Sequence, residues 1–566
     1  MSDLLKQSLQ ARLLDAGLVR AGRQAARTLV PTAALVFGLA GCGGNLKPTV
    51  TPILGTGPAS QPTASAFVVS TPTSSSSAQG YGTVIDYSGD TIMATAPIGP
   101  SPSTFAINSG GTQAWTLNSD KSLSNIPVST TLQAKQITFS TLNTYNGINP
   151  VVSLFGGFLG LYALDVNLNE VDVLTGTPGA FNRDVPVDTT PITAVGVSSS
   201  TRIYTVSQIV PYATCTGAQT PTCVPSTMTL DGKTVDSAVA CNIDPHSPDL
   251  AGFTGIADGI ETATYTRSSQ IPVGICPVYA IATPDSRRLF VLNRGSDTIS
   301  VINSQNNAID SCPKNSVNQN GQVYNCYPAL PLSTTALANL EANLCPTPTA
   351  ATCILPPNIA TANLPAVAGP VYAEYNTATE QLVVSNFDGS TVNIIDVSLD
   401  EFGNDSPTFG TTYTVQVGKN PASVTVLADG SRAYTANQTD GTVSIVNLSS
   451  HSIETTLPVT GNPRSVSSIQ NSEQGKVYVV SPNSPNVTII RVDQDIIDTS
   501  ILVQGNALDV RVNSPDTNAA NTNLTSRLPG AGQPCYLPPS AFTGSTPLSL
   551  ANCQALSTSL LTAAPN

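Results

Sequence analysis

The stretch "YTANQTDGTVSIVN", residues 434 to 447, consists of an apolar run led by an aromatic residue, a turn, and a second apolar run. Nearly the same phrase occurs as "FVLNRGSDTISVIN" from Phe290 and as "LVVSNFDGSTVNIID" from Leu382. In all three copies an Asn precedes by six residues the Ile or Val that opens the second run. The phrase is therefore an internal repeat, and short apolar runs separated by turn residues indicate paired β-strands.

A proline precedes the aromatic residue of these units by a fixed thirteen residues. The spacing separates Pro102 from Trp115, Pro191 from Tyr204, Pro277 from Phe290 and Pro421 from Tyr434. Between them lies a β-branched run closed by tight-turn residues, as in "PASVTVLADGSRAYTAN". With a fourth run such as "IETTLPV", each unit predicts four short strands in about 40 to 50 residues, which is the period of a propeller blade.

These units resemble YVTN-type β-propeller repeats, in which a proline, a Val-rich strand, Asp-Gly, Tyr-Val-x-Asn and another Val-rich strand follow one another. The match is carried by Pro421, Asp429, Gly430, Tyr434, Asn437 and Val443, and by Pro277, Asp285, Phe290, Asn293 and Ile299. It is strong over roughly 270 to 512, where further copies begin near Pro370 and Pro463. From 66 to 270 the copies near Pro102, Pro150 and Pro191 are degenerate.

The two ends of the repeat region predict how the ring closes. Residues 66 to 98 lack a first strand, whereas "VQGNALDVRVN" near the C-terminus reads as a first strand without the rest. Together they would form one split blade, and closure would remove the unpaired sheet edges. We therefore expect an all-β propeller over 66–512 with seven or eight four-stranded blades, closed by its N- and C-terminal strands. The seven proline-led units and the split blade add up to eight, whereas the resemblance favours seven.

The N-terminus predicts export and a lipid anchor. A basic leader precedes an apolar segment from about Leu29 to Gly41, which is too short to cross a hydrocarbon core of about 30 Å. The residues Leu39-Ala40-Gly41-Cys42 resemble the bacterial lipobox, which implies removal of 1–41 and lipid on Cys42. Residues 42–65 would then be a flexible linker, and the membrane of the bacterial cell envelope would be one partner. Because Gly43 follows the cysteine, we expect the lipid-anchored protein to be delivered to the outer membrane. The alternative to the lipid anchor is an ordinary secretory signal in which the Cys is incidental.

The remaining ten of the eleven cysteines predict disulfides. An even number of cysteines in an exported protein, without CxxC spacing or an adjacent His, favours bridges over metal sites or nucleophiles. Neighbour pairing would join Cys215 with Cys223, Cys241 with Cys276, Cys312 with Cys326, Cys345 with Cys353, and Cys535 with Cys553. Most of them fall in or near two expected insertions, 209–270 and 304–368, and the last pair lies in a loop-like tail, 513–566. The connectivity stays open.

Composition argues against several classes of partner and cofactor. Charged residues make up 10% of the chain, the net charge is −13, and no basic run follows the first fifty residues, which argues against nucleic acid. The chain has two histidines, His246 and His451, which cannot build a multi-histidine metal centre. We expect no metal and no cofactor, and we expect both histidines to be surface residues.

Charged residues on first strands are the remaining candidates for chemistry. Strand alternation allows Glu374, Arg464 and Asp509 to face the central channel, where a convergent acid, base and cation would indicate catalysis. Solvated rim charges are the alternative that we favour. The sequence thus predicts a non-enzymatic scaffold that binds a protein or polysaccharide of the envelope. A lactonase-like hydrolase, implied by the resemblance, and a structural surface-layer component are the alternatives.

Overall fold

A computed structural model gives the fold of the protein. It describes residues 64–513, all within one compact unit that spans Gln61–Asn566. Outside the described residues lie 73–77, 103, 108–112, 119, 121, 128–139, 142–150, 157–160, 166–167, 176–179, 198–200, 212–226, 311–328, 345–362, 401–404, 407 and 470–471.

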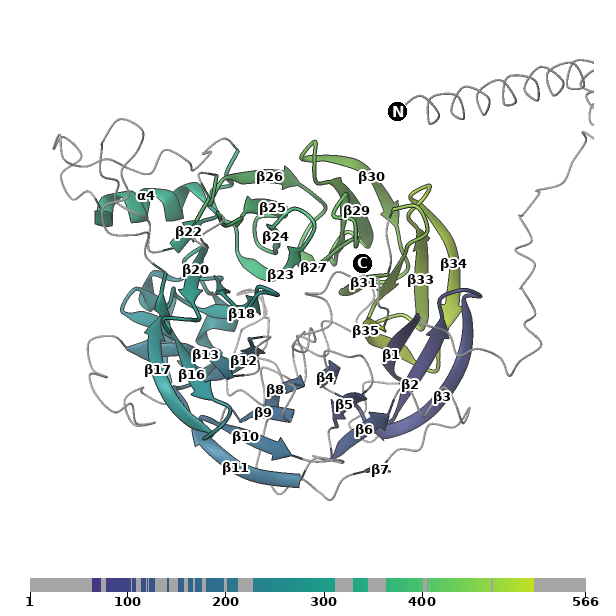
Figure 1. The fold of residues 1–566 in the computed structure, drawn as a ribbon, viewed down its shortest axis with the longest axis horizontal. Helices are drawn as coiled ribbons and strands as arrows, with labels where there is room; N and C mark the ends of the chain where they lie inside the picture. The colour runs from purple at the N-terminus through teal and green to yellow at the C-terminus, as the bar shows by residue number, and fades with distance from the viewer. Residues whose placement is uncertain are drawn as a thin grey trace, which may run out of the picture. The chain divides into compact units, whose positions relative to one another are not determined.

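Eight of the nine sheets formed by the described strands are arranged in a ring, so the fold is an all-β propeller with eight blades (Figure 1). The first strand of each blade lies innermost and the fourth outermost (Figure 1).

Blade I contains β35 (Asn506–Asn513), β1 (Ser65–Thr71), β2 (Gln79–Asp86) and β3 (Thr91–Pro100). Blade II contains β4 (Thr104–Ile107), β5 (Gln113–Leu117), β6 (Leu123–Pro127) and β7 (Ser140–Thr141). Blade III contains β8 (Val151–Gly156), β9 (Leu161–Asp165), β10 (Glu170–Thr175) and β11 (Ala180–Pro186). Blade IV contains β12 (Pro191–Gly196), β13 (Arg202–Pro211), β16 (Phe253–Glu261) and β17 (Thr266–Pro272).

The strands of the second half of the ring follow the same order. Blade V contains β18 (Pro277–Ala282), β19 (Arg288–Asn293), β20 (Thr298–Asn303), β21 (Ala308–Ile309) and β22 (Ala329–Pro331). Blade VI contains β23 (Pro370–Asn376), β24 (Gln381–Asn386), β25 (Thr391–Asp396) and β26 (Thr412–Gln416). Blade VII contains β27 (Pro421–Val426), β28 (Arg432–Asn437), β29 (Thr442–Asn447) and β30 (Ser452–Pro458). Blade VIII contains β31 (Ser465–Ile469), β32 (Lys476–Val480), β33 (Asn486–Arg491) and β34 (Ile496–Leu502). Other elements are β14 (Thr227–Leu230), β15 (Lys233–Asp236), η1 (Ser237–Val239), α3 (Ala240–Ile243), η2 (Pro248–Leu250) and α4 (Thr334–Leu344).

The repeated proline and asparagine have a structural role in blades V, VI and VII. Pro421 opens β27 directly opposite Asn437, which ends β28, and the register shifts just after the proline. A proline cannot donate to a sheet ladder, so the first residue of a strand beside a bulge is where it is tolerated. The buried Asn437 donates from Nδ2 to Thr442 Oγ1 at 3.0 Å and Ser444 Oγ at 2.9 Å, which fastens the turn into the third strand. Equivalent bonds recur in blade V and in blade VI, where Asn393 Oδ1 replaces the serine hydroxyl as the second acceptor, so the phrase encodes a strand–turn–strand unit.

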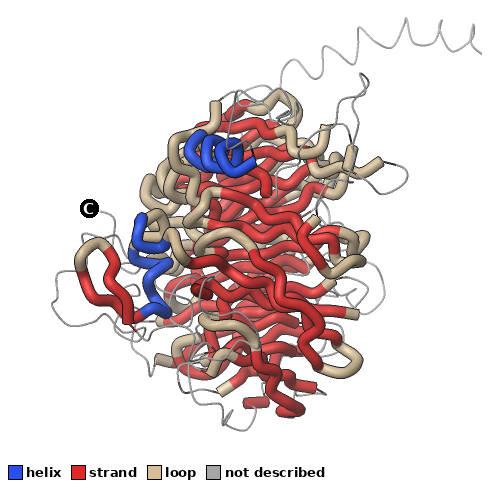
Figure 2. Tube along the Cα trace, turned by 90° about the vertical axis from the view of Figure 1, so that its left-hand side faces the viewer, coloured by secondary structure: helices blue, strands red, loops and turns tan. Residues whose placement is uncertain are grey.

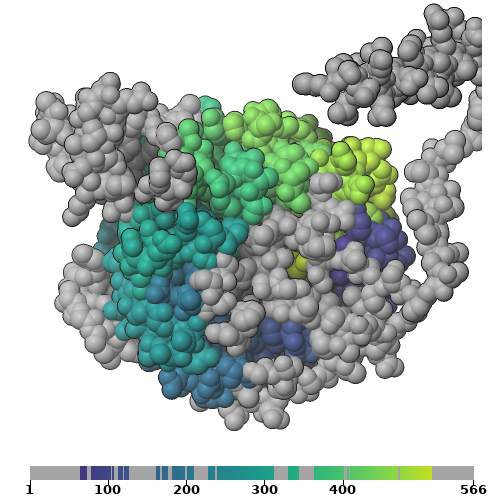
Figure 3. All heavy atoms as spheres, in the orientation of Figure 1, coloured from purple at the N-terminus to yellow at the C-terminus, as the bar shows by residue number. Residues whose placement is uncertain are grey.

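The ring is closed by strands from the two ends of the described chain, as expected. The strand β35 pairs antiparallel with β1 from Ser65 to Thr71, and Ser70 Oγ donates to Gln504 O at 2.8 Å. Val510 and Val512 are buried in an apolar cluster that includes residues of β1, β2 and blade VIII. In the space-filling view the yellow end of the described chain lies beside its purple beginning (Figure 3).

Both expected insertions interrupt blades, but they differ from the sequence prediction. The range 209–270 contains β16 and most of β17, which are the third and fourth strands of blade IV, so the interruption is shorter. The range 304–368 interrupts the outer strand of blade V, because β21 and β22 pair with opposite ends of β20.

Outer turns fasten neighbouring blades through a second recurrent contact. Arg432 and the hydroxyl of Tyr434, both on β28, bind the carboxylate of Asp495, in the turn before β34 of blade VIII. Lys476 on β32 binds in the same way to Asp90, before β3 of blade I, with Nζ 2.6 Å from Oδ2. Both aspartates have positive φ, 52° and 49°, which Asp tolerates better than most residues. A cation two residues before the buried tyrosine is therefore the sequence signal of this contact.

No helix in the described part of the chain is long and apolar enough to cross a membrane. The expected leader 1–41, the linker residues 42–63 with the expected lipid site Cys42, and the tail from 514 lie outside the described residues.

Candidate functional site

The three first-strand candidates make contacts that tie inner strands together. Glu374 on β23 is fully buried, and its Oε2 accepts a hydrogen bond from the backbone N–H of Val426 on β27. Arg464, which directly precedes β31, is 3% exposed, and its carbonyl accepts from Ser423 Oγ on β27 at 2.7 Å. Each contact links one blade to the next around the ring.

Asp509 on β35 continues this series. Its Oδ1 accepts from Ser465 Oγ on β31 at 2.5 Å, and its Oδ2 pairs with Arg511 Nη2 at 3.2 Å. The guanidinium of Arg511 in turn lies 5.9 Å from the ring centroid of Phe105 on β4 of blade II. The favoured expectation of solvated rim charges is therefore wrong, because Glu374, Arg464 and Asp509 are all buried. The side chains of Glu374 and Asp509 and the backbone carbonyl of Arg464 join neighbouring inner strands.

A different cluster appears where the copies of the repeated phrase differ from one another. In blade V, Arg294 directly follows the repeated Asn. In blade VI, Asp388 lies two residues after the repeated Asn of that blade. Arg294 binds Asp388 with two hydrogen bonds, Nε to Oδ2 at 2.8 Å and Nη2 to Oδ1 at 2.7 Å. A bidentate guanidinium–carboxylate pair of this kind is strong and geometrically specific. It joins the turns of two adjacent blades.

His246 completes this cluster from outside the repeat. Its Nε2 lies 3.2 Å from Asp388 Oδ2 and 3.9 Å from Asp297 Oδ1, and its side chain is 27% exposed. His246 is thus partly exposed, as a surface histidine would be, but its imidazole also sits between two carboxylates, which the sequence did not predict. We call Arg294, Asp297, Asp388 and His246 the rim cluster.

Electrostatics in the rim cluster favour the charged forms of Asp388 and His246. Burial alone would raise the pKa of Asp388, but the Arg294 guanidinium, with His246, holds it well below its ordinary value. Burial disfavours the imidazolium, yet the hydrogen bond to Asp388 and the charge of Asp297 outweigh it and raise the pKa of His246. Burial also raises the pKa of Asp297, although Asp297 Oδ1 accepts from Gly369 N at 2.7 Å.

The segment that brings His246 to the rim is residues 227–250, which we call the strap. It lies between β13 and β16 of blade IV and contains β14, β15, η1, α3 and η2. Figure 2 shows the short helices and the β14–β15 hairpin on one flat side of the ring. Leu230, Val235 and Ile243 bury their side chains in an apolar cluster shared with blades III and IV.

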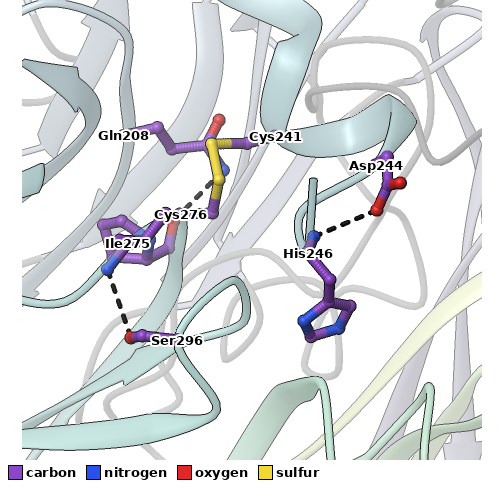
Figure 4. The surroundings of a disulfide bond; sticks show 8 residues. Gln208, Cys241, Asp244, His246, Ile275, Cys276 and Ser296 are labelled. Carbon is purple, nitrogen blue, oxygen red and sulfur yellow. Dashed lines mark hydrogen bonds between the residues drawn. A yellow bond between two sulfur atoms is a disulfide. The ribbon is translucent and has the colours of Figure 1, made fainter. Parts of the chain in front are cut away.

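Three fastenings hold the strap to the blades that follow. Cys241 of α3 forms a disulfide with Cys276, which directly precedes β18 of blade V (Figure 4). The carbonyl of Pro245 packs so closely on Gly295 that an added Cβ there would lie 2.5 Å from it. His246 then reaches Asp388 in blade VI. The strap therefore bridges blades IV, V and VI on one face.

The structure contains the expected Cys241–Cys276 pair, but this bridge joins the strap to the next blade instead of closing a loop within an insertion. The other cysteines lie outside the described residues: Cys215, Cys223, Cys312, Cys326, Cys345, Cys353, Cys535 and Cys553. In the part of the chain that the structure describes, no group of three His, Cys, Asp or Glu residues is arranged to hold a metal ion.

Comparison with known proteins gives likeness to solved structures and nothing closer. The chain matches no protein-family profile and no curated protein. It resembles Citrobacter koseri AztD at 10% identity, over 79% of this chain and 97% of that one, with a TM-score of 0.46. It also resembles the dihydro-heme d1 dehydrogenase NirN in complex with DHE, at 9% identity over 83% and 78% of the two chains, with a TM-score of 0.47. A putative 6-phosphogluconolactonase from Bacteroides fragilis is 12% identical over 81% and 99%, with a TM-score of 0.41.

Proposed function

We propose that this protein is an exported, lipid-anchored propeller with YVTN-type repeats that binds a protein or polysaccharide partner in the bacterial cell envelope and acts as a scaffold. The observation that carries the proposal is the strap, which bridges three blades on one face and is held there by a disulfide and an ion pair. A loop platform fixed in this way loses little conformational entropy on binding, which favours recognition.

The inner strands support the same proposal. Their buried carboxylates, Glu374 and Asp509, accept hydrogen bonds that link blades, so their role in the ring does not require a substrate. The anchor rests on the lipobox-like residues 39–42 and on a linker long enough to separate the propeller from a membrane.

Binding is tested by recovering partners from an envelope extract with the purified protein as bait, and by sedimentation with purified peptidoglycan. Thr229 and Thr234 are exposed on the strap, and the matched control positions Ser452 and Ser500 are exposed on outer strands. Arg at both strap positions should abolish recovery of a specific partner, whereas Arg at both control positions should not. Equal recovery with both double variants would contradict a role for the strap, and hydrolysis of a sugar lactone that is lost in Glu374→Gln would favour an enzyme.

The anchor is tested separately by Cys42→Ala. The variant should remain as unprocessed precursor without incorporating labelled fatty acid, whereas the control Cys553→Ala should be acylated normally. Release of the wild-type protein in soluble, unacylated form would refute the lipid anchor.

A further inference from the structure

The three fastenings of the strap differ in their chemistry. The disulfide and the packing of Pro245 on Gly295 contain no group that titrates near neutral pH, whereas the third fastening depends on an imidazole. Histidine is the residue whose ordinary pKa lies in this range. Among these three fastenings, the contact with blade VI alone contains a group that titrates in this range.

The charges that surround His246 are unbalanced when the imidazole is neutral. Asp388 faces it from blade VI and Asp297 faces it from blade V, while Arg294 supplies one positive charge. On the strap itself, Asp244 accepts a hydrogen bond from the backbone N–H of His246 at 3.0 Å (Figure 4). When His246 is protonated, the imidazolium and Arg294 together supply two positive charges for the two carboxylates of the rim cluster, Asp297 and Asp388. Because Arg294 occupies both oxygens of Asp388, that carboxylate stays ionised throughout the range in which a histidine titrates.

We propose that the rim cluster is a proton-operated lock, in which protonation of His246 fastens the strap to blade VI and loss of that proton loosens this end. The geometry that carries it is an imidazole 3.2 Å from one carboxylate and 3.9 Å from another, on a segment whose disulfide, Pro245 packing and apolar contacts described above go to blades III to V. The lock is a property of the folded chain and holds whether or not the protein acts as a scaffold.

The direction of the pH effect follows from linkage. The pKa of His246 is raised in the docked strap, against burial and mainly by its hydrogen bond to Asp388, relative to the ordinary value of 6.5 in a released strap. The added stability of docking is therefore fully present below the ordinary pKa and is lost as the pH rises through the raised one. Acidification tightens the strap.

Hydrogen exchange of the intact protein tests this lock. Protection of strap peptides, expressed relative to peptides of 421–447 and corrected for intrinsic exchange, should rise roughly five-fold from about pH 7.5 to about pH 5.5, since a charged hydrogen bond is stronger than a neutral one. The increase should vanish in His246→Gln and persist in His451→Gln, the other histidine of the chain. An unchanged ratio in the wild type, or a rise that survives in His246→Gln, would overturn the proposal.

A titration of the two imidazoles by NMR provides a second test that does not depend on strap mobility. With isotope-labelled histidine the protein gives two signals, which the His451→Gln variant assigns. His246 should titrate above 6.5, whereas burial lowers the pKa of His451. In Asp388→Asn the His246 midpoint should fall, because the amide removes the charge but keeps a polar side chain at this position. A midpoint that does not move in this variant would refute the lock.

Discussion

Replacing Asp172 by Asn is expected to stabilise the protein at pH 7 and to have little effect at pH 4. Asp172 lies on β10 of blade III, is 3% exposed, and stands directly opposite Asp184 of β11. Like charges in directly opposed positions destabilise a sheet. Burial, with the added repulsion of Asp184, raises the pKa of Asp172 from 3.8 to about 6. The stability linked to its proton is therefore present below the unfolded pKa and is lost as the pH rises through about 6.

The size of the effect follows from this shift. One pKa unit corresponds to about 1.4 kcal/mol, so the shift from 3.8 to about 6 costs the wild type about 3 kcal/mol at pH 7. At pH 4 the Asp172 carboxyl is partly protonated in the unfolded chain as well, so the same linkage reduces the cost to the wild type to about 0.5 kcal/mol. A buried amide can cost some hydrogen-bonding energy, but that cost is the same at both pH values. The gain of Asp172→Asn should therefore be roughly 2 kcal/mol larger at pH 7 than at pH 4.

Urea unfolding of the wild type, Asp172→Asn and the control Asp184→Asn at both pH values measures this difference. The control should give a smaller gain, because it removes the repulsion but leaves Asp172 buried. If Asp172→Asn stabilises the protein equally at pH 4 and pH 7, its effect does not come from titration and the reasoning is refuted.

Three further predictions concern the ring and its bridges. Truncation after Ile501 should cause aggregation because it exposes the edge of β1, whereas truncation after Asp516 should be tolerated. Light scattering and calorimetry measure this. If the protein truncated after Ile501 is monomeric with an unchanged melting temperature, β35 is not the strand that closes the ring. Arg432→Ala should cost about 2 kcal/mol in urea unfolding because it leaves Asp495 half-buried without its cation, while the control Arg491→Ala, in an exposed pair, should cost under about 0.5 kcal/mol. All ten cysteines other than the lipid site should resist thiol labelling under denaturing, non-reducing conditions, and labelling beyond a trace would contradict five disulfides.

The architecture was largely predictable from the sequence because its determinants are local. Pro421, Asn437 and the Thr that opens the next strand lie within 22 residues, and Asn437 both pairs with Pro421 and donates to that Thr inside one blade. The split blade was predictable because residues 66 to 98 lack a first strand, whereas the C-terminal stretch supplies a first strand without the other three. The strands β16 and β17 escaped prediction because a 41-residue connection from Pro211 to Phe253 separates them from the first half of their blade.

The rim cluster could not be predicted, because it depends on how the strap crosses the face. His246 and Asp388 are 142 residues apart, and no local pattern joins them. A partial signal was nevertheless present, since Arg294 and Asp388 occupy turn positions where the other copies of the phrase carry different residues. Glu374 and Asp509 lie on first strands as expected, and Arg464 directly precedes one, but their contacts with adjacent blades depend on ring geometry that alternation alone does not give.

The pairing of β35 with β1 also sets the order of events in biosynthesis. The two strands meet across a sequence separation of 434 residues, as in the bond between Ser70 and Gln504. At about 5 to 20 residues per second, the ribosome needs roughly 20 to 90 s to make the partner of β1 after β1 itself. During that interval the free edge of β1 has no innermost strand, so the nascent chain has to be kept from pairing with other chains before its last strand arrives.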